Sequence, residues 1–122
     1  MAAPFQKFDV PKEIVDETYK AVEIATETGK IKRGVNETTK ALERGVAKLV
    51  IIAGDVAPPE IVAYLPKLSD EKQTPYVVVP SRKDLGTASG VNVPTSSIAI
   101  IEAGNAKDLI SGIAKKVSQL KK

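Results

Sequence analysis

Three short runs of consecutive apolar residues, rich in β-branched side chains, constrain most strongly what this chain can fold into. They cover Leu49–Ala53, Tyr76–Val79 and Ile98–Ile101, the last of which belongs to a strand expected at residues 98–102. Such runs, without polar alternation, are typical of strands that are buried on both faces of a sheet. Segments with helical periodicity separate the runs, and a fourth short strand is expected at residues 31–35. This alternation predicts an α/β fold, a three-layer α/β/α sandwich around a central mixed four-stranded sheet.

Two helices are expected before the first of these runs. One follows Pro11, which suits a first helical turn, and Gly29 is a natural stop for it. The second spans residues 36–45, with Asn36 as its N-cap.

Three more helices are expected in the second half of the chain. The first starts at Pro58-Pro59, is kinked at Pro66 and carries Ile61, Leu65 and Leu68 on one side. The next opens with a capping box of Ser81 and Asp84 and closes at Gly90. In the last, Asn105 and Asp108 cap a helix whose core face carries Leu109, Ile113, Val117 and Leu120.

The length of 122 residues fits one domain over residues 1–122, without repeats or low-complexity tracts. Its apolar runs are too short to span a bilayer, and the N-terminal segment lacks the apolar core of a secretory signal. We therefore expect a cytoplasmic protein with no membrane partner.

The composition argues against an enzyme. The chain has no Cys and no His, which excludes thiolate metal sites, Cys nucleophiles and the commonest general base. We expect no catalytic residues, no metal, no cofactor and no small-molecule substrate. A small α/β enzyme that uses carboxylate or Lys chemistry stays the alternative from another functional class, because fold alone does not decide function.

Polar side chains gather on one side of the helix expected at residues 36–45. At about 100° per residue, Asn36, Glu37, Lys40 and Arg44 fall within one arc of about 100°. The other side carries Thr38, Ala41, Leu42 and Gly45, which are expected to pack inward.

This polar face has two interpretations. The first is RNA binding, because the Asn36 amide and the Glu37 carboxylate can hydrogen-bond base edges. Positive charge that can attract phosphates is supplied by Lys32, Arg33 and Lys40. The plainer interpretation is a helix cap at Asn36 followed by a solvated ladder of charges. Spacing alone favours the plainer interpretation.

A second candidate element is the loop of Val91, Asn92 and Val93, hereafter the 91–93 loop. It follows Gly86 and Gly90, and two valines in such a turn are awkward to expose. The loop is either an apolar lid on an unstacked base or a turn whose valines enter the core. A phosphate-binding loop is disfavoured because GxxxxGK[ST] is absent.

The run from Lys32 to Lys40, followed by Glu43-Arg44-Gly45, resembles the signature of the archaeal large-subunit ribosomal protein seven-Ae family. That family is related to the eukaryotic kink-turn proteins of spliceosomal and nucleolar particles. The resemblance continues, in order, through residues 50–53, 55–58, 65–66, 75–77 and 85–90. One departure is Gly54, where many relatives carry Glu; any RNA contact made there is altered in this chain.

The resemblance implies a protein that binds and stabilises kink-turns and kink-loops, RNA bends built around tandem sheared G·A pairs. Asn36, Glu37 and Lys40 would then read the guanines in the major groove that the bend opens. The implied RNA-binding residues are Lys32, Arg33, Gly34, Asn36, Glu37, Lys40, Arg44, Val91, Asn92 and Val93; of these, Lys32, Gly34 and Arg44 match positions near the RNA backbone, and the 91–93 loop matches the one that caps an extruded nucleotide.

The family serves the large ribosomal subunit, the box C/D and H/ACA guide-RNA particles, and archaeal ribonuclease P. The implied partners are therefore these RNAs and the other ribonucleoprotein subunits that assemble on them. Two alternatives stay open beside the enzyme. One is a sister ribosomal protein of the same fold that binds another RNA bend, and the other is a protein-only module that docks through the 91–93 loop.

Overall fold

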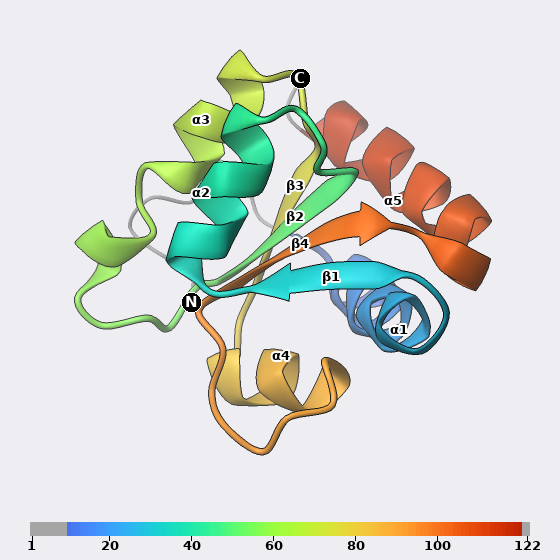
Figure 1. Ribbon diagram of the computed structural model, residues 1–122, viewed down its shortest axis with the longest axis horizontal. Helices are drawn as coiled ribbons and strands as arrows, with labels where there is room; N and C mark the ends of the chain where they lie inside the picture. The colour runs from blue at the N-terminus through green and yellow to red at the C-terminus, as the bar shows by residue number, and fades with distance from the viewer. Residues whose placement is uncertain (1–9, 121–122) are drawn as a thin grey trace.

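The central sheet has four strands in the order β1-β4-β2-β3, as the computed structural model shows (Figure 1). The strands are β1 (Lys30–Arg33), β2 (Leu49–Ala53), β3 (Tyr76–Val79) and β4 (Ser97–Glu102). β2 and β3 are parallel, whereas β4 runs antiparallel to both β1 and β2. The predicted mixed four-stranded sheet is thereby confirmed. The structure describes residues 10–120.

Five α-helices surround the sheet: α1 (Lys12–Thr28), α2 (Val35–Glu43), α3 (Leu65–Glu71), α4 (Arg82–Ala88) and α5 (Lys107–Leu120). Two 3₁₀ turns, η1 (Pro59–Ile61) and η2 (Gly104–Ala106), precede α3 and α5. α1 packs against α4 and α5, whereas α2 packs against α3 (Figure 1). These two groups of helices form the outer layers of the predicted sandwich.

The hydrophobic core lies on β2 and the strands beside it. All five residues of β2 are buried, and so are all four of β3. Burying one Ile or Val side chain contributes about 1.5–3 kcal/mol, so this continuous apolar run is the main source of the sheet's stability. The run is buried on both faces because helices cover both, as the sequence pattern predicts.

The segment from Pro58 to Glu71 differs from the single kinked helix that we expected. It forms η1 and then a separate helix, α3, in which Pro66 lies in the first turn. A proline there breaks no hydrogen bond, because the first N–H groups of a helix have no partner within it. Ile61, which we expected on the same side of one helix as Leu65, is 45% exposed, whereas Leu65 is buried.

The cap predicted for the last helix is also wrong. Asn105 lies inside η2, and its backbone N–H donates to Thr28 Oγ1 at 2.9 Å. The capping bond predicted at α4 is confirmed, because Ser81 Oγ accepts from the Asp84 N–H at 3.1 Å.

Within residues 10–120, no helix is both long enough and apolar enough to cross a membrane. Residues 1–9, on which the expectation about a secretory signal rests, lie outside the described part of the chain.

Candidate nucleic-acid interface

Gly34 joins β1 to α2 and sets where the helix begins. Its φ of +95° is in the left-handed region, which glycine adopts without a steric penalty. Its N–H donates to Ser97 O at 2.8 Å, and its carbonyl accepts from the Thr38 N–H at 2.9 Å. A Cβ added at Gly34 would meet no atom within 4 Å, so the position requires glycine for its backbone conformation and not for lack of space.

Asn36 is not the N-cap of this helix, contrary to the sequence interpretation. The helix begins one residue earlier, at Val35, with Gly34 as the cap, and its start carries no side-chain capping bond. The reason is that glycine can make the turn that a capping side chain would otherwise stabilise. The exposed Asn36 amide is therefore not used to begin the helix.

Glu37 and Lys40 point outward from the first turns of α2. Glu37 Oε1 and Lys40 Nζ lie 3.8 Å apart, and their side chains are 46% and 56% exposed. An ion pair this open stabilises a protein by at most about 1 kcal/mol. Both side chains can consequently change partners at little cost when a polar ligand approaches.

The inner face of α2 is packed into the protein, and this packing fixes the orientation of the outer face. Thr38, Ala41 and Leu42 are buried, as predicted. Gly45 is not, because α2 ends at Glu43 and the chain turns away at Gly45 with a φ of +71°. Arg44, the C-cap residue, is exposed at this end of the helix.

Thr39 links α2 to the segment before α3. Its Oγ1 donates to Val35 O at 2.8 Å and lies 2.6 Å from the Tyr64 hydroxyl. Tyr64 is 43% exposed and adds apolar surface beside α2 that the sequence did not predict, and Ile61 in η1 is 45% exposed. The sequence pattern grouped Ile61 with Leu65 and Leu68, and no spacing pattern distinguishes Ile61 and Tyr64 from buried residues.

The 91–93 loop lies across α4. The Val91 N–H donates to Gly86 O at 3.1 Å, and the Thr95 N–H donates to Arg82 O at 3.0 Å. A Cβ at Gly86 would overlap the carbonyl oxygen of Val93, so the backbone of the loop rests directly on the helix.

The side chains of the 91–93 loop differ in exposure. Val93 is 61% exposed and Asn92 is exposed, whereas Val91 is half-buried. The interpretation that the valines enter the core is therefore wrong for Val93. An apolar side chain that a fixed backbone holds in the solvent can pack against a flat apolar ligand.

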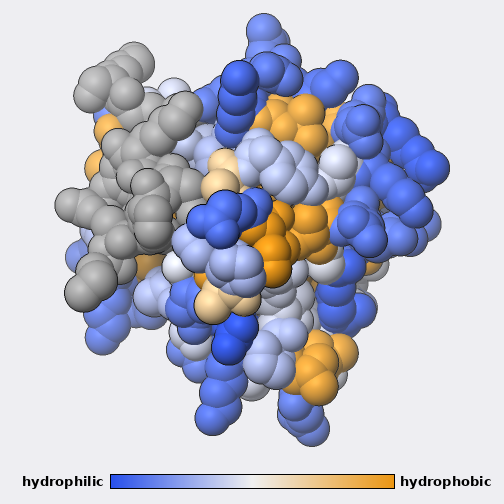
Figure 2. All heavy atoms as spheres, turned by 90° about the vertical axis from the view of Figure 1, so that its left-hand side faces the viewer, coloured by the Kyte–Doolittle hydropathy of each residue, from blue (hydrophilic) through white to orange (hydrophobic). Residues whose placement is uncertain are grey.

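The loop and the start of α2 lie at the same edge of the molecule. β4 begins at Ser97, four residues after Val93, and pairs with β1 so that Ile98 is opposite Arg33. Figure 1 shows the segment before β4 lying close to the end of β1, where α2 begins. Figure 2 faces this side of the molecule, and on it apolar side chains gather in the centre between hydrophilic ones.

Arg33 is exposed as well, but its guanidinium is bound to the end of α4. Its Nε donates to Ser89 Oγ at 3.2 Å, and its Nη2 donates to Ser89 O. Lys32, its neighbour in β1, is exposed. The structure therefore brings Lys32, Gly34, Asn36, Glu37 and Lys40 to one stretch of surface, and places the guanidinium of Arg33 against the end of α4.

Two other features lie apart from this surface. Asp55 Oδ1 accepts a hydrogen bond from the backbone N–H of Arg82, the first residue of α4, at 2.8 Å. A cavity of about 500 Å³ lies between the start of β3 and α5, lined by Tyr76 and Val117 among others. Within residues 10–120, no cluster of acidic side chains could hold a metal ion.

The chain is similar to known proteins in both sequence and fold. A sequence model of the ribosomal protein L7Ae/L30e/S12e/Gadd45 family matches residues 16–110. Among solved structures, the fold is similar to that of a 15.5kD RNA binding protein from Giardia lamblia, with a TM-score of 0.90. The two sequences are 37% identical, and the match covers 96% of this chain and 98% of the other.

Proposed function

The chain belongs to the ribosomal protein L7Ae/L30e/S12e/Gadd45 family, and from this premise we propose that it binds kink-turn and kink-loop RNA. The related protein from Giardia lamblia is described as RNA binding. The proposed site combines the outer face of α2 with the 91–93 loop, and the proposed ligand feature is the pair of tandem G·A base pairs beside the bend.

The observation that carries this proposal is the start of α2. Because Gly34 caps the helix, the Asn36 side chain makes no capping hydrogen bond. Glu37 and Lys40 are held only by a solvent-exposed ion pair. Three polar side chains are thus presented together on a helix that is fixed from behind by buried Thr38 and Leu42.

The chemistry of these side chains suits guanine. The Glu37 carboxylate accepts hydrogen bonds, which matches the N1–H and N2–H₂ donors of guanine, and Lys40 donates, which matches O6. Asn36 can both donate and accept. The major groove of A-form RNA is too narrow for side chains, so this reading requires an RNA whose groove a bend has opened.

The remaining residues would contact the RNA outside the base edges. Exposed Lys32 and Arg44 flank the start and end of α2 and supply charge for phosphates. The N–H of Gly34 is already bonded to Ser97, so its contribution is an open surface on which the RNA backbone can approach closely. Val93, with Val91 and Asn92 beside it, would cover the extruded nucleotide.

Binding of this kind acts by population shift. The free RNA exchanges between extended and kinked forms, and a protein that binds only the kinked form moves the equilibrium toward it by its differential affinity. We propose that the protein serves in this way as a structural component of the large ribosomal subunit and of box C/D and H/ACA particles, with ribonuclease P as a further particle. Other subunits would assemble on the RNA that it holds, in the cytoplasm, and it would have no catalytic residues of its own.

A second candidate is a member of the same family that binds a different RNA bend. The family description itself includes several ribosomal proteins. The combination of Asn36, Glu37 and Lys40 on one face favours tandem G·A pairs, because together they offer acceptors and donors for guanine edges.

The proposal is tested by a gel-shift titration at one stated salt concentration. The probe is a short RNA with tandem G·A pairs beside a three-nucleotide bulge, and the control RNA carries Watson–Crick pairs in their place. We expect tight binding to the probe alone. Equal affinity for both RNAs would show that the protein binds by charge only and would refute the proposal.

A further inference from the structure

The guanidinium of Arg33 connects the two halves of the proposed site. Arg33 is the last residue of β1 and directly precedes Gly34, the cap of α2. Its Nε and Nη2 both donate to Ser89, one to Oγ at 3.2 Å and the other to the backbone carbonyl. A single side chain therefore joins the start of α2 to the end of α4.

Ser89 is the point from which the 91–93 loop leaves α4. It is the C-cap residue of the helix and is fully buried. Its Oγ donates to Gly86 O at 2.9 Å while accepting from Arg33 Nε. The last carbonyls of a helix lack partners within it, and here Arg33 supplies one for Ser89.

The backbone that follows depends on this cap. Gly90 turns with a φ of +82°, and the Val91 N–H returns to Gly86 O, the same carbonyl that accepts from Ser89 Oγ. Val93 then rests on Gly86. The position of the exposed Val93 side chain is thus set by a short chain of contacts that begins at Arg33.

From these contacts we infer that Arg33 is a positioning residue for RNA recognition and not a direct phosphate contact. It fixes the 91–93 loop at a set distance from the polar face of α2, so that both reach one RNA at once. The inference rests on the proposed function. Holding the loop before RNA arrives reduces the entropy lost on binding, which raises affinity without adding a contact to the RNA.

Arg and Lys are not interchangeable in this role. Two donors of the planar guanidinium fork reach two acceptors on one residue, which a Lys ammonium cannot reproduce. Lys would still provide a positive charge near the RNA. Arg33→Lys therefore separates positioning from simple charge attraction.

The test is a double-mutant cycle measured as affinity for the kink-turn RNA. The variants are Arg33→Lys, Val93→Ser and the two together, with Lys115→Ala as the control. We expect Arg33→Lys alone to weaken binding about three- to tenfold, the size of one or two net hydrogen bonds. In the Val93→Ser background the same change should cost almost nothing, because the loop it positions no longer contributes.

Hydrogen exchange in the free protein gives a readout that needs no RNA. We expect the amides of residues 89–93 to exchange faster in Arg33→Lys, and in Ser89→Ala, which keeps the fold because alanine fits the buried position. Amides of α2 and β2 should be unchanged. This measurement reports on the link itself, whether or not the RNA preference is as proposed.

The outcomes separate the two claims. Equal costs of Arg33→Lys with and without Val93→Ser, together with a salt slope reduced by about one phosphate contact, would identify Arg33 as a phosphate ligand and overturn the inference. Unchanged exchange at residues 89–93 would overturn it as well. Failure of the wild-type protein to distinguish the two RNAs would refute the proposed function, and the exchange data would still show whether Arg33 holds the loop.

Discussion

The hydroxyl oxygens of Thr38 and Ser97 lie 3.0 Å apart, and both residues are fully buried. Thr38 lies on the inner face of α2, and Ser97 is the first residue of β4. The backbone of Ser97 also accepts from Gly34, so the start of α2 is bound to β4 on two sides. This attachment sets the direction in which Asn36, Glu37 and Lys40 point.

Thr38→Val keeps the shape of the side chain and removes its hydroxyl. Ser97 Oγ then loses its Thr38 partner in a buried position, which should lower the free energy of unfolding by about 1–3 kcal/mol in urea denaturation. Ser97→Ala should cost less stability in the Thr38→Val background than in the wild-type protein, because there it removes a hydroxyl that has already lost its Thr38 partner. Strictly additive costs would show that the two hydroxyls do not interact.

Gly34→Ala tests whether the start of α2 must be built on glycine. Gly34 and Gly45 both have positive φ angles, and an added Cβ meets nothing within 4 Å at either. Alanine at either position should cost about 1–2 kcal/mol of stability through backbone strain. Gly34→Ala should weaken RNA binding more than Gly45→Ala, since Gly34 lies beside Asn36 and Glu37 whereas Gly45 lies beside Arg44 alone. Equal loss of affinity in both variants would argue against a site at the start of α2.

The two valines of the loop should respond differently to a polar substitution. Val93→Asp should weaken RNA binding and leave the melting temperature nearly unchanged, because this side chain is 61% exposed. Val91→Asp should lower both, because Val91 is half-buried. Thermal denaturation and gel shift on each variant check this, and a large fall in melting temperature for Val93→Asp would assign that side chain to the core.

The free energy of unfolding should fall at high pH because the Tyr19 hydroxyl ionises less readily in the folded protein than in the unfolded chain. Burial raises the pKa of this phenol above its usual value of 10.0, and the nearby carboxylates of Asp84 and Asp55 raise it further, while its bond to the Ser81 backbone opposes them. Because the folded protein holds the proton more tightly than the unfolded chain, the stabilisation is complete below pH 10.0 and is lost as pH rises through the raised pKa.

Tyr19→Phe should therefore make the unfolding free energy fall less steeply above pH 10, measured by urea denaturation at several pH values. The pKa of Tyr76 is also raised, by burial and by Asp70. Because Tyr76 remains in the variant, the unfolding free energy of Tyr19→Phe should still fall with pH, but less steeply. Identical pH profiles for the two proteins would contradict this account.

Much of the fold was predictable because its signals are local. The continuous apolar run of β2 and the helical spacing of α1 each determine an element without reference to distant residues. The strand order was not predictable, because β1 pairs with β4, about 70 residues away along the chain, and no pattern within either strand encodes its neighbour.

The helix face that carries the candidate residues could be predicted, but its start and its contacts with other elements could not. Helical spacing placed Glu37 and Lys40 on one face, and the open ion pair between them agrees with that. The cap at Gly34 was missed because Asn36 is the better capping residue by propensity, whereas the tertiary bond from Gly34 to Ser97 decides where the helix starts. The bond from Arg33 to Ser89 could not be seen either, since it joins residues 56 positions apart.

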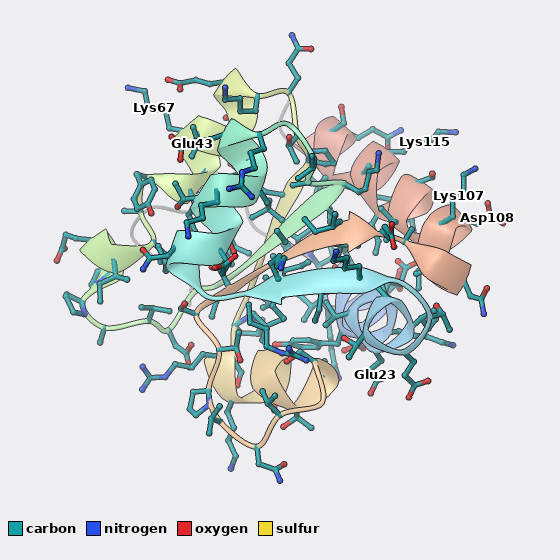
Figure 3. The ribbon with its side chains drawn as sticks, in the orientation of Figure 1. Glu23, Glu43, Lys67, Lys107, Asp108 and Lys115 are labelled. Atoms are coloured by element: carbon teal, nitrogen blue, oxygen red, sulfur yellow. The ribbon has the colours of Figure 1, made fainter. Side chains whose placement is uncertain are left out.

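The central claim is that the outer face of α2 reads the bases of a kinked RNA. The most direct measurement is the ratio of affinities for the G·A RNA and its Watson–Crick control, taken for the wild-type protein, Glu37→Ala and Lys115→Ala. Lys115 serves as a distant surface control because it lies on α5, across the molecule from α2 (Figure 3). Glu37→Ala should lose about 1–3 kcal/mol of this discrimination, while Lys115→Ala keeps the wild-type ratio. An unchanged ratio in Glu37→Ala, or equal losses in both variants, would contradict base reading by α2.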